Sequence, residues 1–164
     1  MNYNINTVED SDLDYIISLN ENSLPAVSSL DILGVKYFLE FSSYFKIIRD
    51  NDLPIGFLIG LMPGKDYSSE NYIWVNERYD SFIYVDRIII DTQYRQRGIG
   101  SYFYNHLAET YNGKVESITC EVNIMPYNKP SIDFHEKYGF KEVGQEDTEN
   151  GKKRVSYMMY KIPR

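Results

Sequence analysis

Apolar residues along this chain recur with two spacings, one typical of helices and the other of strands. After the capping residue Asp10 or Ser11, the spacing of Leu13, Ile16 and Ile17 predicts a helix that runs to about residue 20. Runs rich in β-branched and aromatic residues predict strands, because such side chains pack well on a pleated surface. By these criteria we predict strands over residues 4–8, 44–49, 55–62, 82–90, 117–122, 140–145 and 154–161, and further helices over 31–41, 98–111 and 130–138.

Turn residues between these segments predict two hairpins, at residues 50–52 and at Asn150-Gly151. Residues 64–80 are polar and aromatic without a clear period, which predicts a flexible loop near a site. The predicted order is β, α, α, β, β, β, α, β, α, β, β. This order predicts one domain over residues 1–164 of the α/β (α+β) class, a mixed sheet with helices on both faces.

Composition and charge narrow the classes of function. The 17 Lys and Arg residues against 24 Asp and Glu residues give a net charge of −7, which argues against nucleic acid as the main partner. A single cysteine, Cys120, allows no internal disulfide or zinc cluster, and we expect it in the core. The first ten residues do not resemble a secretion signal, and no apolar run approaches the ~20 residues of a membrane span. We therefore expect no membrane association and a cytoplasmic location.

The most informative segment is the loop Arg95-Gln-Arg-Gly-Ile-Gly-Ser101, between a predicted strand and a predicted helix. Main-chain amides at a helix start are unpaired and attract anions, and Gly98 and Gly100 let them approach a diphosphate closely. No lysine follows the glycines as in a Walker A loop, and Phe103 stands where a dinucleotide fingerprint has its third glycine. A glycine-rich turn that merely starts a helix is the alternative.

An apolar strand followed by Arg-x-x-Gly-x-Gly resembles the acyl-CoA site of the GNAT superfamily of N-acetyltransferases. The resemblance implies that the loop amides hold the pyrophosphate of acetyl-CoA, and that the end of the strand pairs with the pantetheine arm and the acyl carbonyl. The cofactor-binding residues implied by this first motif are Ile88, Ile89, Ile90, Arg95, Gln96, Arg97, Gly98, Ile99, Gly100 and Ser101.

A second stretch, Asn128 to Phe140, also resembles the family, which has an Asn, a small residue three positions on, an aromatic pair and then Gly-Phe. By this resemblance Asn128 contacts the pantetheine arm and Ser131 takes the small-residue position. Asn123 and Phe134 complete the implied cofactor set. The chain departs from the family at His135, where many members have a tyrosine that protonates the leaving thiolate. An imidazole can also donate a proton near neutral pH, so His135 and Tyr138 are the candidate acids, and packing beside CoA is the alternative for His135.

The resemblance implies a mixed, mostly antiparallel twisted sheet of about seven strands, with about four helices on its two faces. It implies transfer of an acetyl or short acyl group from acetyl-CoA to a primary amine, by direct attack in a ternary complex without a metal. We expect a small-molecule amine as acceptor, and a monomer or homodimer. The chain also resembles a GNAT subgroup to which no substrate can be attached, through residues 67–74, 84–87, 121–123 and 134–135.

An amine acceptor must lose a proton before or during attack, and a carboxylate can take it. Asp86 interrupts an apolar strand, and family members often use an acidic residue there, so it is the first candidate for the base and Glu121 the second. Direct pairing of Asp86 with Arg87 is not expected, because neighbouring strand residues point to opposite faces. Further residues expected to shape the acceptor pocket are Tyr67, Asn71, Tyr72, Trp74 and Tyr84.

Three other functions remain compatible with the sequence. A non-catalytic acyl-CoA sensor would use the same fold and bind without turnover. A nucleotide-binding enzyme would use the glycine loop for ATP or NAD. A structural dimer with a degenerate site would pair through an open sheet edge.

Overall fold

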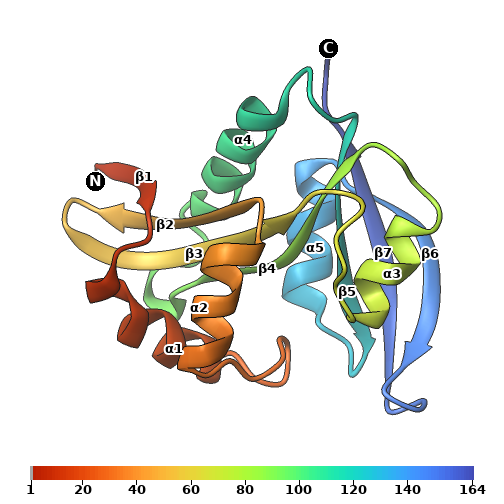
Figure 1. Cartoon of the computed structure of the whole chain (residues 1–164), viewed down its shortest axis with the longest axis horizontal. Helices are drawn as coiled ribbons and strands as arrows, with labels where there is room; N and C mark the ends of the chain where they lie inside the picture. Colours follow the sequence, from red (N-terminus) through yellow and green to blue (C-terminus); the bar gives the residue numbers. More distant parts are fainter. Residues whose placement is uncertain (1) are drawn as a thin grey trace. The chain divides into compact units, whose positions relative to one another are not determined.

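The computed structural model describes residues 2–164 (Figure 1). The contacts of these residues form two compact units. The first unit comprises the chain up to Leu61 together with Val85–Leu107, and the second comprises Met62–Tyr84 and Ala108–Arg164. Strand β4 (Phe82–Ile90) contributes to both units. The prediction of one domain stays a prediction.

The first unit contains a run of antiparallel strands with two helices beside it. Strands β1 (Tyr3–Thr7), β2 (Tyr44–Asp50) and β3 (Leu53–Leu61) pair in sequence order. Helices α1 (Leu13–Glu21) and α2 (Ile32–Phe41) lie side by side, and most of α4 (Ile99–Tyr111) also belongs to this unit. Its core is aliphatic and aromatic, because alternate strand residues and one helical stripe turn inward. Fully buried members include Ile16, Ile47, Ile55, Phe57, Leu58 and Phe103.

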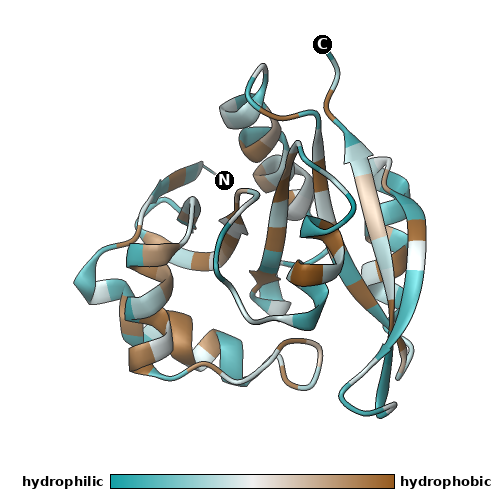
Figure 2. Cartoon of the chain, turned by 45° about the vertical axis from the view of Figure 1, so that its right-hand side comes forward, coloured by the Kyte–Doolittle hydropathy of each residue, from teal (hydrophilic) through white to brown (hydrophobic). Residues whose placement is uncertain are grey.

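The second unit contains α3 (Glu70–Asn76), β5 (Ser117–Met125), α5 (Lys129–Tyr138), β6 (Lys141–Thr148) and β7 (Lys153–Lys161). Strand β5 pairs in parallel with the first three residues of β4, Phe82–Tyr84, through Ser117–Thr119. On its other side β5 pairs antiparallel with β7, which in turn pairs antiparallel with β6. Strand β6 ends the strand order and is mostly exposed, and Figure 2 shows it largely hydrophilic.

The strand order β1-β2-β3-β4-β5-β7-β6 confirms the predicted mixed, mostly antiparallel seven-stranded sheet. The described chain has five α-helices rather than about four, because residues 64–80 are not simply a loop. They contain α3, whose cap Ser69 accepts a hydrogen bond from the Tyr72 amide at 3.4 Å. A helix of seven residues makes two turns, too few to show a helical period against the surrounding aromatic residues.

Smaller differences from the sequence predictions have local causes. The first predicted helix begins with a short 3₁₀ turn, Asp10–Asp12. Glu9 is the N-cap of this turn and forms a reciprocal capping box with Asp12, so neither Asp10 nor Ser11 is the cap. Cys120 is 3% exposed, which confirms its place in the core. None of the helices in residues 2–164 is long and apolar enough to span a membrane.

Candidate functional site

The predicted phosphate loop folds as a sharp turn that opens helix α4. After β4, a short 3₁₀ turn at Thr92–Tyr94 leads to Arg95, and the backbone is then left-handed at Gln96, with φ of 61°, and at Gly98, with φ of 77°. The first α4 hydrogen bond runs from the Tyr102 amide to the Gly98 carbonyl at 3.0 Å. The amides of the three residues between them therefore point out of the helix start, where the helix dipole adds partial positive charge.

This loop is open enough for a diphosphate. Residues 95–98 are exposed, whereas Ile99 is 2% exposed and anchors the helix start in the core. A Cβ placed on Gly98 would meet no protein atom within 4 Å. Unpaired helix-start amides, open space above Gly98 and two exposed arginines together form an arrangement that fits an anion.

The strand before the loop is held in place from one side. The Ile90 carbonyl accepts a hydrogen bond from Arg95 Nε at 3.1 Å. Gly56 of β3 lies so close to β4 that an added Cβ would be 2.6 Å from the Ile89 carbonyl oxygen. Ile89 is buried, while Ile88 and Ile90 are half-buried, so this end of β4 is fixed by packing on β3.

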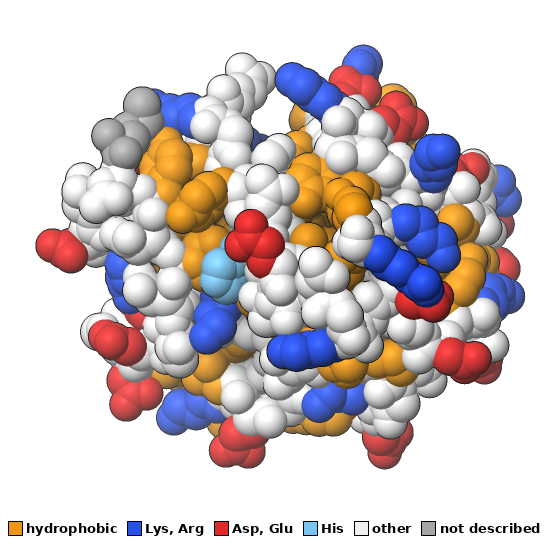
Figure 3. Space-filling view, turned by 90° about the horizontal axis from the view of Figure 1, so that it is seen from above, with side chains coloured by type: hydrophobic (Ala, Val, Ile, Leu, Met, Phe, Trp, Pro, Cys, Tyr) orange, Lys and Arg blue, Asp and Glu red, His pale blue; other side chains and the backbone are white. Residues whose placement is uncertain are grey.

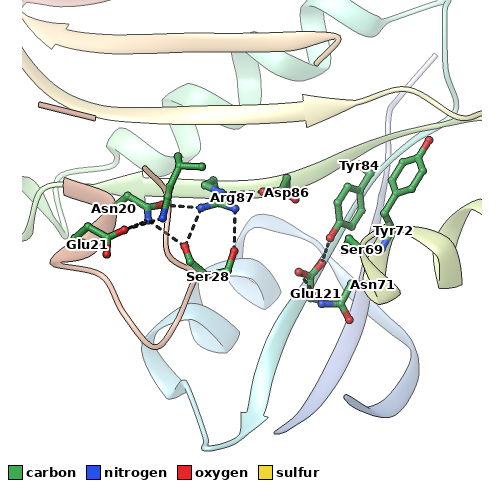
Figure 4. A network of polar contacts seen from close by, with 11 residues as sticks. Asn20, Glu21, Ser28, Ser69, Asn71, Tyr72, Tyr84, Asp86, Arg87 and Glu121 are labelled. Carbon is green, nitrogen blue, oxygen red and sulfur yellow. Dashed lines mark hydrogen bonds and ion pairs between the residues drawn. The ribbon is translucent and has the colours of Figure 1, made fainter. Parts of the chain in front are cut away.

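Asp86 and Arg87 pair directly. The sequence-based expectation of no direct pairing was therefore wrong. Arg87 Nε donates to Asp86 Oδ2 at 2.8 Å, and the two side chains are 4% and 6% exposed (Figure 4). The arginine side chain is long enough to bring its guanidinium back to the neighbouring carboxylate. Asp86 is therefore one member of a buried ion pair.

The same guanidinium holds the segment between α1 and α2. Arg87 donates to Asn20 Oδ1 at 2.8 Å and to the Ser28 carbonyl and hydroxyl at 3.0 and 3.1 Å (Figure 4). Asn20 is fully buried. Next to it, the Leu30 amide donates to Glu21 at 2.7 Å and is the largest cause of the lowered pKa of that carboxyl. This network fixes residues 20–30 of the first unit.

Glu121, the second candidate for the base, is held by neutral groups. Its Oε2 accepts the Tyr84 hydroxyl at 2.6 Å, and its Oε1 accepts the Asn71 amide at 3.2 Å (Figure 4). Tyr84 is fully buried, and Glu121 is half-buried. The structure thus brings together three of the predicted residues, from β4, α3 and β5.

The other predicted acceptor residues have different environments. Tyr72 is 1% exposed, and its hydroxyl donates to the Met62 carbonyl at 2.6 Å and accepts the Lys65 amide at 3.0 Å, so it is a core residue and not a pocket wall. Trp74 stacks on Tyr157, with ring centroids 4.0 Å apart. The sequence did not single out Tyr157. Its only signal was its place in the predicted strand 154–161, two positions after Val155.

The second motif forms the start and inner face of α5. Asn128 caps this helix by accepting the Ser131 amide at 3.3 Å, which directs its oxygen to the helix start and leaves its NH₂ group as the donor for the pantetheine contact that the resemblance implies. Its own main-chain amide donates to the Asn123 carbonyl at 3.0 Å, which ties the cap to β5. Phe134 is half-buried and makes an edge contact with the His135 ring.

The two candidate acids differ in how they hold their protons. His135 is 4% exposed, and burial lowers its pKa from 6.5 to about 4, so the imidazole is neutral at pH 7. Its Nδ1 is 2.7 Å from the Ser131 carbonyl and must carry the proton there, which leaves Nε2 as an acceptor. Burial raises the pKa of Tyr138 to about 12, so that phenol keeps its proton. His106, expected to be structural, lies with Nδ1 2.8 Å from the Tyr44 hydroxyl.

Metal and surface charge add two constraints. No group of three or more His, Cys, Asp or Glu side chains in residues 2–164 is arranged to hold a metal ion. Figure 3 shows acidic and basic side chains interspersed over the face in view, which therefore has no single sign of charge.

Comparison with known proteins agrees with this geometry. The model of the acetyltransferase (GNAT) family matches residues 13–140. Ard1 from Thermoplasma volcanium has a TM-score of 0.78 at 15% identity, over 99% of each chain. The ribosomal-protein-S18-alanine N-acetyltransferase from Escherichia coli has a TM-score of 0.72 at 16% identity, over 99% of this chain and 95% of its own.

A third structure is that of NAA60 from Arabidopsis thaliana in complex with acetyl-CoA, with a TM-score of 0.76 at 16% identity, over 98% of this chain and 99% of its own. These identities are low, so the three structures establish the fold. No functionally curated protein matches the sequence, and no subgroup is identified. The family model covers most of the chain, and we conclude that this protein belongs to the acetyltransferase (GNAT) family of acetyl-CoA-dependent N-acetyltransferases.

Proposed function

We propose that this protein transfers an acetyl or short acyl group from acetyl-CoA to the primary amine of a small molecule in the cytoplasm, by direct attack in a ternary complex. The observation that carries the proposal is the exposed glycine loop at the start of α4, with open space above Gly98. The loop amides hold the diphosphate of the cofactor, and Arg95 and Arg97 add charge beside it. Acetyl-CoA supplies the activated acyl group.

The remaining cofactor contacts follow the family resemblance. Main-chain groups of Ile88, Ile89 and Ile90 pair with the pantetheine arm and polarise the acyl carbonyl. The NH₂ group of Asn128 donates to the same arm, while Asn123, Ser131 and Phe134 complete its surroundings. These groups hold the thioester so that the amine meets it in one orientation.

Glu121 takes the proton of the acceptor amine, directly or through a water molecule. Proton uptake at Asp86 would break a buried ion pair and leave Arg87 without its carboxylate, which is costly. At Glu121 the hydrogen bonds come from the neutral Asn71 and Tyr84, so proton uptake there disturbs neutral donors and not this buried ion pair. This difference reverses the order of the two candidates from the sequence.

Tyr138 stabilises the departing sulfur by donating a hydrogen bond. A phenol with a pKa of about 12 keeps its proton at neutral pH, and a thiolate with an ordinary pKa of about 8.5 takes it only at a cost, so the sulfur receives its proton from solvent. His135 has no acidic proton to give at neutral pH and serves to pack α5. Tyr84 and Trp74 shape the acceptor side through their contacts with Glu121 and Tyr157.

A turnover screen tests this function. Release of the CoA thiol from acetyl-CoA is measured with small amines, amino acids, amine-bearing antibiotics and peptides with a free N-terminus. Turnover with a small amine supports the proposal, and turnover with peptides alone would replace the acceptor class. Tight acetyl-CoA binding without release for any acceptor would favour a non-catalytic sensor on the same fold. Calorimetric binding of ATP or NAD in place of acetyl-CoA would overturn the cofactor assignment.

Glu121→Gln is the matched variant for the base, because it keeps the size of the side chain and removes its charge. We expect kcat to fall by about 10²- to 10⁴-fold, the range of general base catalysis, while the affinity for acetyl-CoA is kept. Asp86→Asn serves as the comparison. A larger loss of kcat in a folded Asp86→Asn protein than in Glu121→Gln would restore Asp86 as the base.

A further inference from the structure

We propose that Asn71 and Tyr157 are positioning residues that aim and stabilise the carboxylate of Glu121, with Tyr157 acting through Asn71. The proposal rests on the role of Glu121 as base proposed above. Neither residue follows from the two sequence motifs, and Tyr157 lies on β7, outside both of them.

The hydrogen bonds around Asn71 determine which way its amide faces. A side-chain amide carries an acceptor oxygen and a donor NH₂ group on the same carbon. A hydrogen bond that fixes the direction of the oxygen therefore also fixes the direction of the NH₂ group. Asn71 Oδ1 accepts the Tyr157 hydroxyl at 3.0 Å, and Asn71 Nδ2 donates to Glu121 Oε1 at 3.2 Å. Turning the amide over would place Oδ1 against the carboxylate, acceptor against acceptor.

Tyr157 fixes the amide only while it donates a proton. Burial is the largest cause that raises the pKa of Tyr157 far above its usual 10, and the charge of Glu121 is the next. The phenol therefore keeps its proton throughout the neutral and mildly alkaline range. The Tyr157 hydroxyl donates, the Asn71 oxygen accepts, and the Asn71 NH₂ group must face Glu121.

The position of the Tyr157 ring is itself fixed by packing. The ring is 1% exposed and lies parallel to the Trp74 ring, with 9° between the planes. The Arg78 guanidinium lies 4.0 Å from the Trp74 ring centroid. Gly144 of β6 provides the room for this stack, since a Cβ there would be 2.5 Å from the Trp74 ring. The hydroxyl therefore stays in reach of Asn71.

Glu121 thus accepts a hydrogen bond from a neutral group on each oxygen, from Asn71 of α3 on Oε1 and from Tyr84 of β4 on Oε2. The charged groups that act on this cluster through Tyr157 are Glu70 of α3, Arg78 after α3 and Glu146 of β6. Both hydrogen bonds favour the charged carboxylate, so losing one makes Glu121 hold its proton to a higher pH. The same loss lets the carboxylate rotate away from the amine.

Tyr157→Phe tests the proposal, because it removes the hydroxyl and keeps the ring stack. Hydrogen bonds to a charged group are strong enough to move a titration by about one pH unit or more. We expect the acidic limb of the kcat/KM profile to move up by about one pH unit, and kcat at low pH to fall about tenfold. The KM for acetyl-CoA should stay unchanged. Tyr111→Phe is the matched control, since Tyr111 is also buried, in the part of α4 that belongs to the second unit, and should leave the profile in place.

A double-mutant cycle separates a positioning role from a structural one. In an Asn71→Ala background, Tyr157→Phe should no longer move the acidic limb, because the residue through which it acts is gone. An equal shift in both backgrounds, or no shift in the wild-type background, would overturn the proposal. If Tyr157→Phe does not fold, Asn71→Asp replaces it: a second carboxylate facing Glu121 must move the acidic limb upward, and an unmoved limb counts against the proposal.

Failure of this proposal can be told apart from failure of the proposed base. Full turnover by Glu121→Gln would remove the base assignment and the positioning proposal with it. Loss of turnover in Glu121→Gln, together with an unmoved profile in Tyr157→Phe, would leave the base in place and remove only the role of Tyr157.

Discussion

Replacement of Gly98 by alanine, compared with the same replacement of Gly113, tests whether Gly98 is needed only for its turn or also for binding acetyl-CoA. Gly98 and Gly113 both have φ of 77°, and an added Cβ meets no protein atom within 4 Å at either. They stand on either side of α4, Gly98 just before the helix and Gly113 two residues after it. An alanine in this left-handed conformation costs about 1–2 kcal/mol at each position.

Thermal unfolding measures the conformational cost that the two variants share. For a chain of this size, a loss of about 1 kcal/mol lowers Tm by roughly 2–4 °C. Gly98→Ala and Gly113→Ala should therefore lower Tm by similar amounts, about 2–8 °C for each variant. Circular dichroism or calorimetry without ligand gives both values.

Binding of acetyl-CoA should differ between the two variants. At Gly98 the new methyl group enters the open space where we place the diphosphate, and it keeps at least one amide from the phosphate oxygens. A hydrogen bond to a charged group contributes about 1.5–3 kcal/mol, so the Kd of Gly98→Ala should rise by about 10- to 150-fold. Gly113→Ala should bind as the wild type does.

Titration calorimetry with acetyl-CoA measures these affinities, and acetyl-pantetheine, which lacks the diphosphate, is the control ligand. Its reaction should be equally fast in both variants once they are folded. Equal affinity of Gly98→Ala and Gly113→Ala for acetyl-CoA would show that this loop does not hold the diphosphate, and the reasoning from the helix start would be refuted.

Three further predictions concern stability. Because burial lowers the pKa of His135 from 6.5 to about 4, protons bind the unfolded chain more tightly, and stability present above pH 6.5 is lost as the pH falls toward 4. In His135→Gln, chemical denaturation should show a shallower loss across that window, by about 3 kcal/mol at pH 4; an unchanged slope would contradict this. Arg87→Met leaves a buried carboxylate and amide without their partner and should cost about 3–5 kcal/mol in urea unfolding, whereas Arg154→Met, in an exposed ion pair, should leave the free energy of unfolding nearly unchanged. Equal losses would argue against this difference. Gly144→Ala should lose about 1–3 kcal/mol and shift the fluorescence of Trp74, the only tryptophan, and an unchanged spectrum would show that the stack tolerates a methyl group.

Local sequence was sufficient where the signal was periodic or conformational. The strand Phe82–Ile90 and the helix that follows the glycine loop were predicted within one residue, because β-branched runs and a helical stripe are local properties. Gly98 was identified because a residue without a side chain lets the loop amides approach a diphosphate closely, and the structure adds that its φ is 77°. Helix α3 was missed because its aromatic residues are buried on contacts that the sequence does not display, such as Tyr72 on the Met62 carbonyl.

The relative merit of Asp86 and Glu121 was decided by tertiary contacts. Both are carboxylates in apolar strands, and nothing in the sequence separates an acid paired with a guanidinium from one held by a phenol and an amide. Asp86 pairs with Arg87 although neighbouring strand residues start on opposite faces, because the long arginine side chain reaches back to the carboxylate.

The sequence by itself determined the order of elements, the glycine loop and the residue types available for proton transfer. Only the tertiary structure decided which of these side chains meet. Tyr157, Asn71 and Glu121 lie on three different elements, and their hydrogen bonds arise from packing between segments up to 86 positions apart. Burial, which sets the proton affinity of His135, Tyr138 and Tyr157, is likewise a property of the folded chain and not of any one segment.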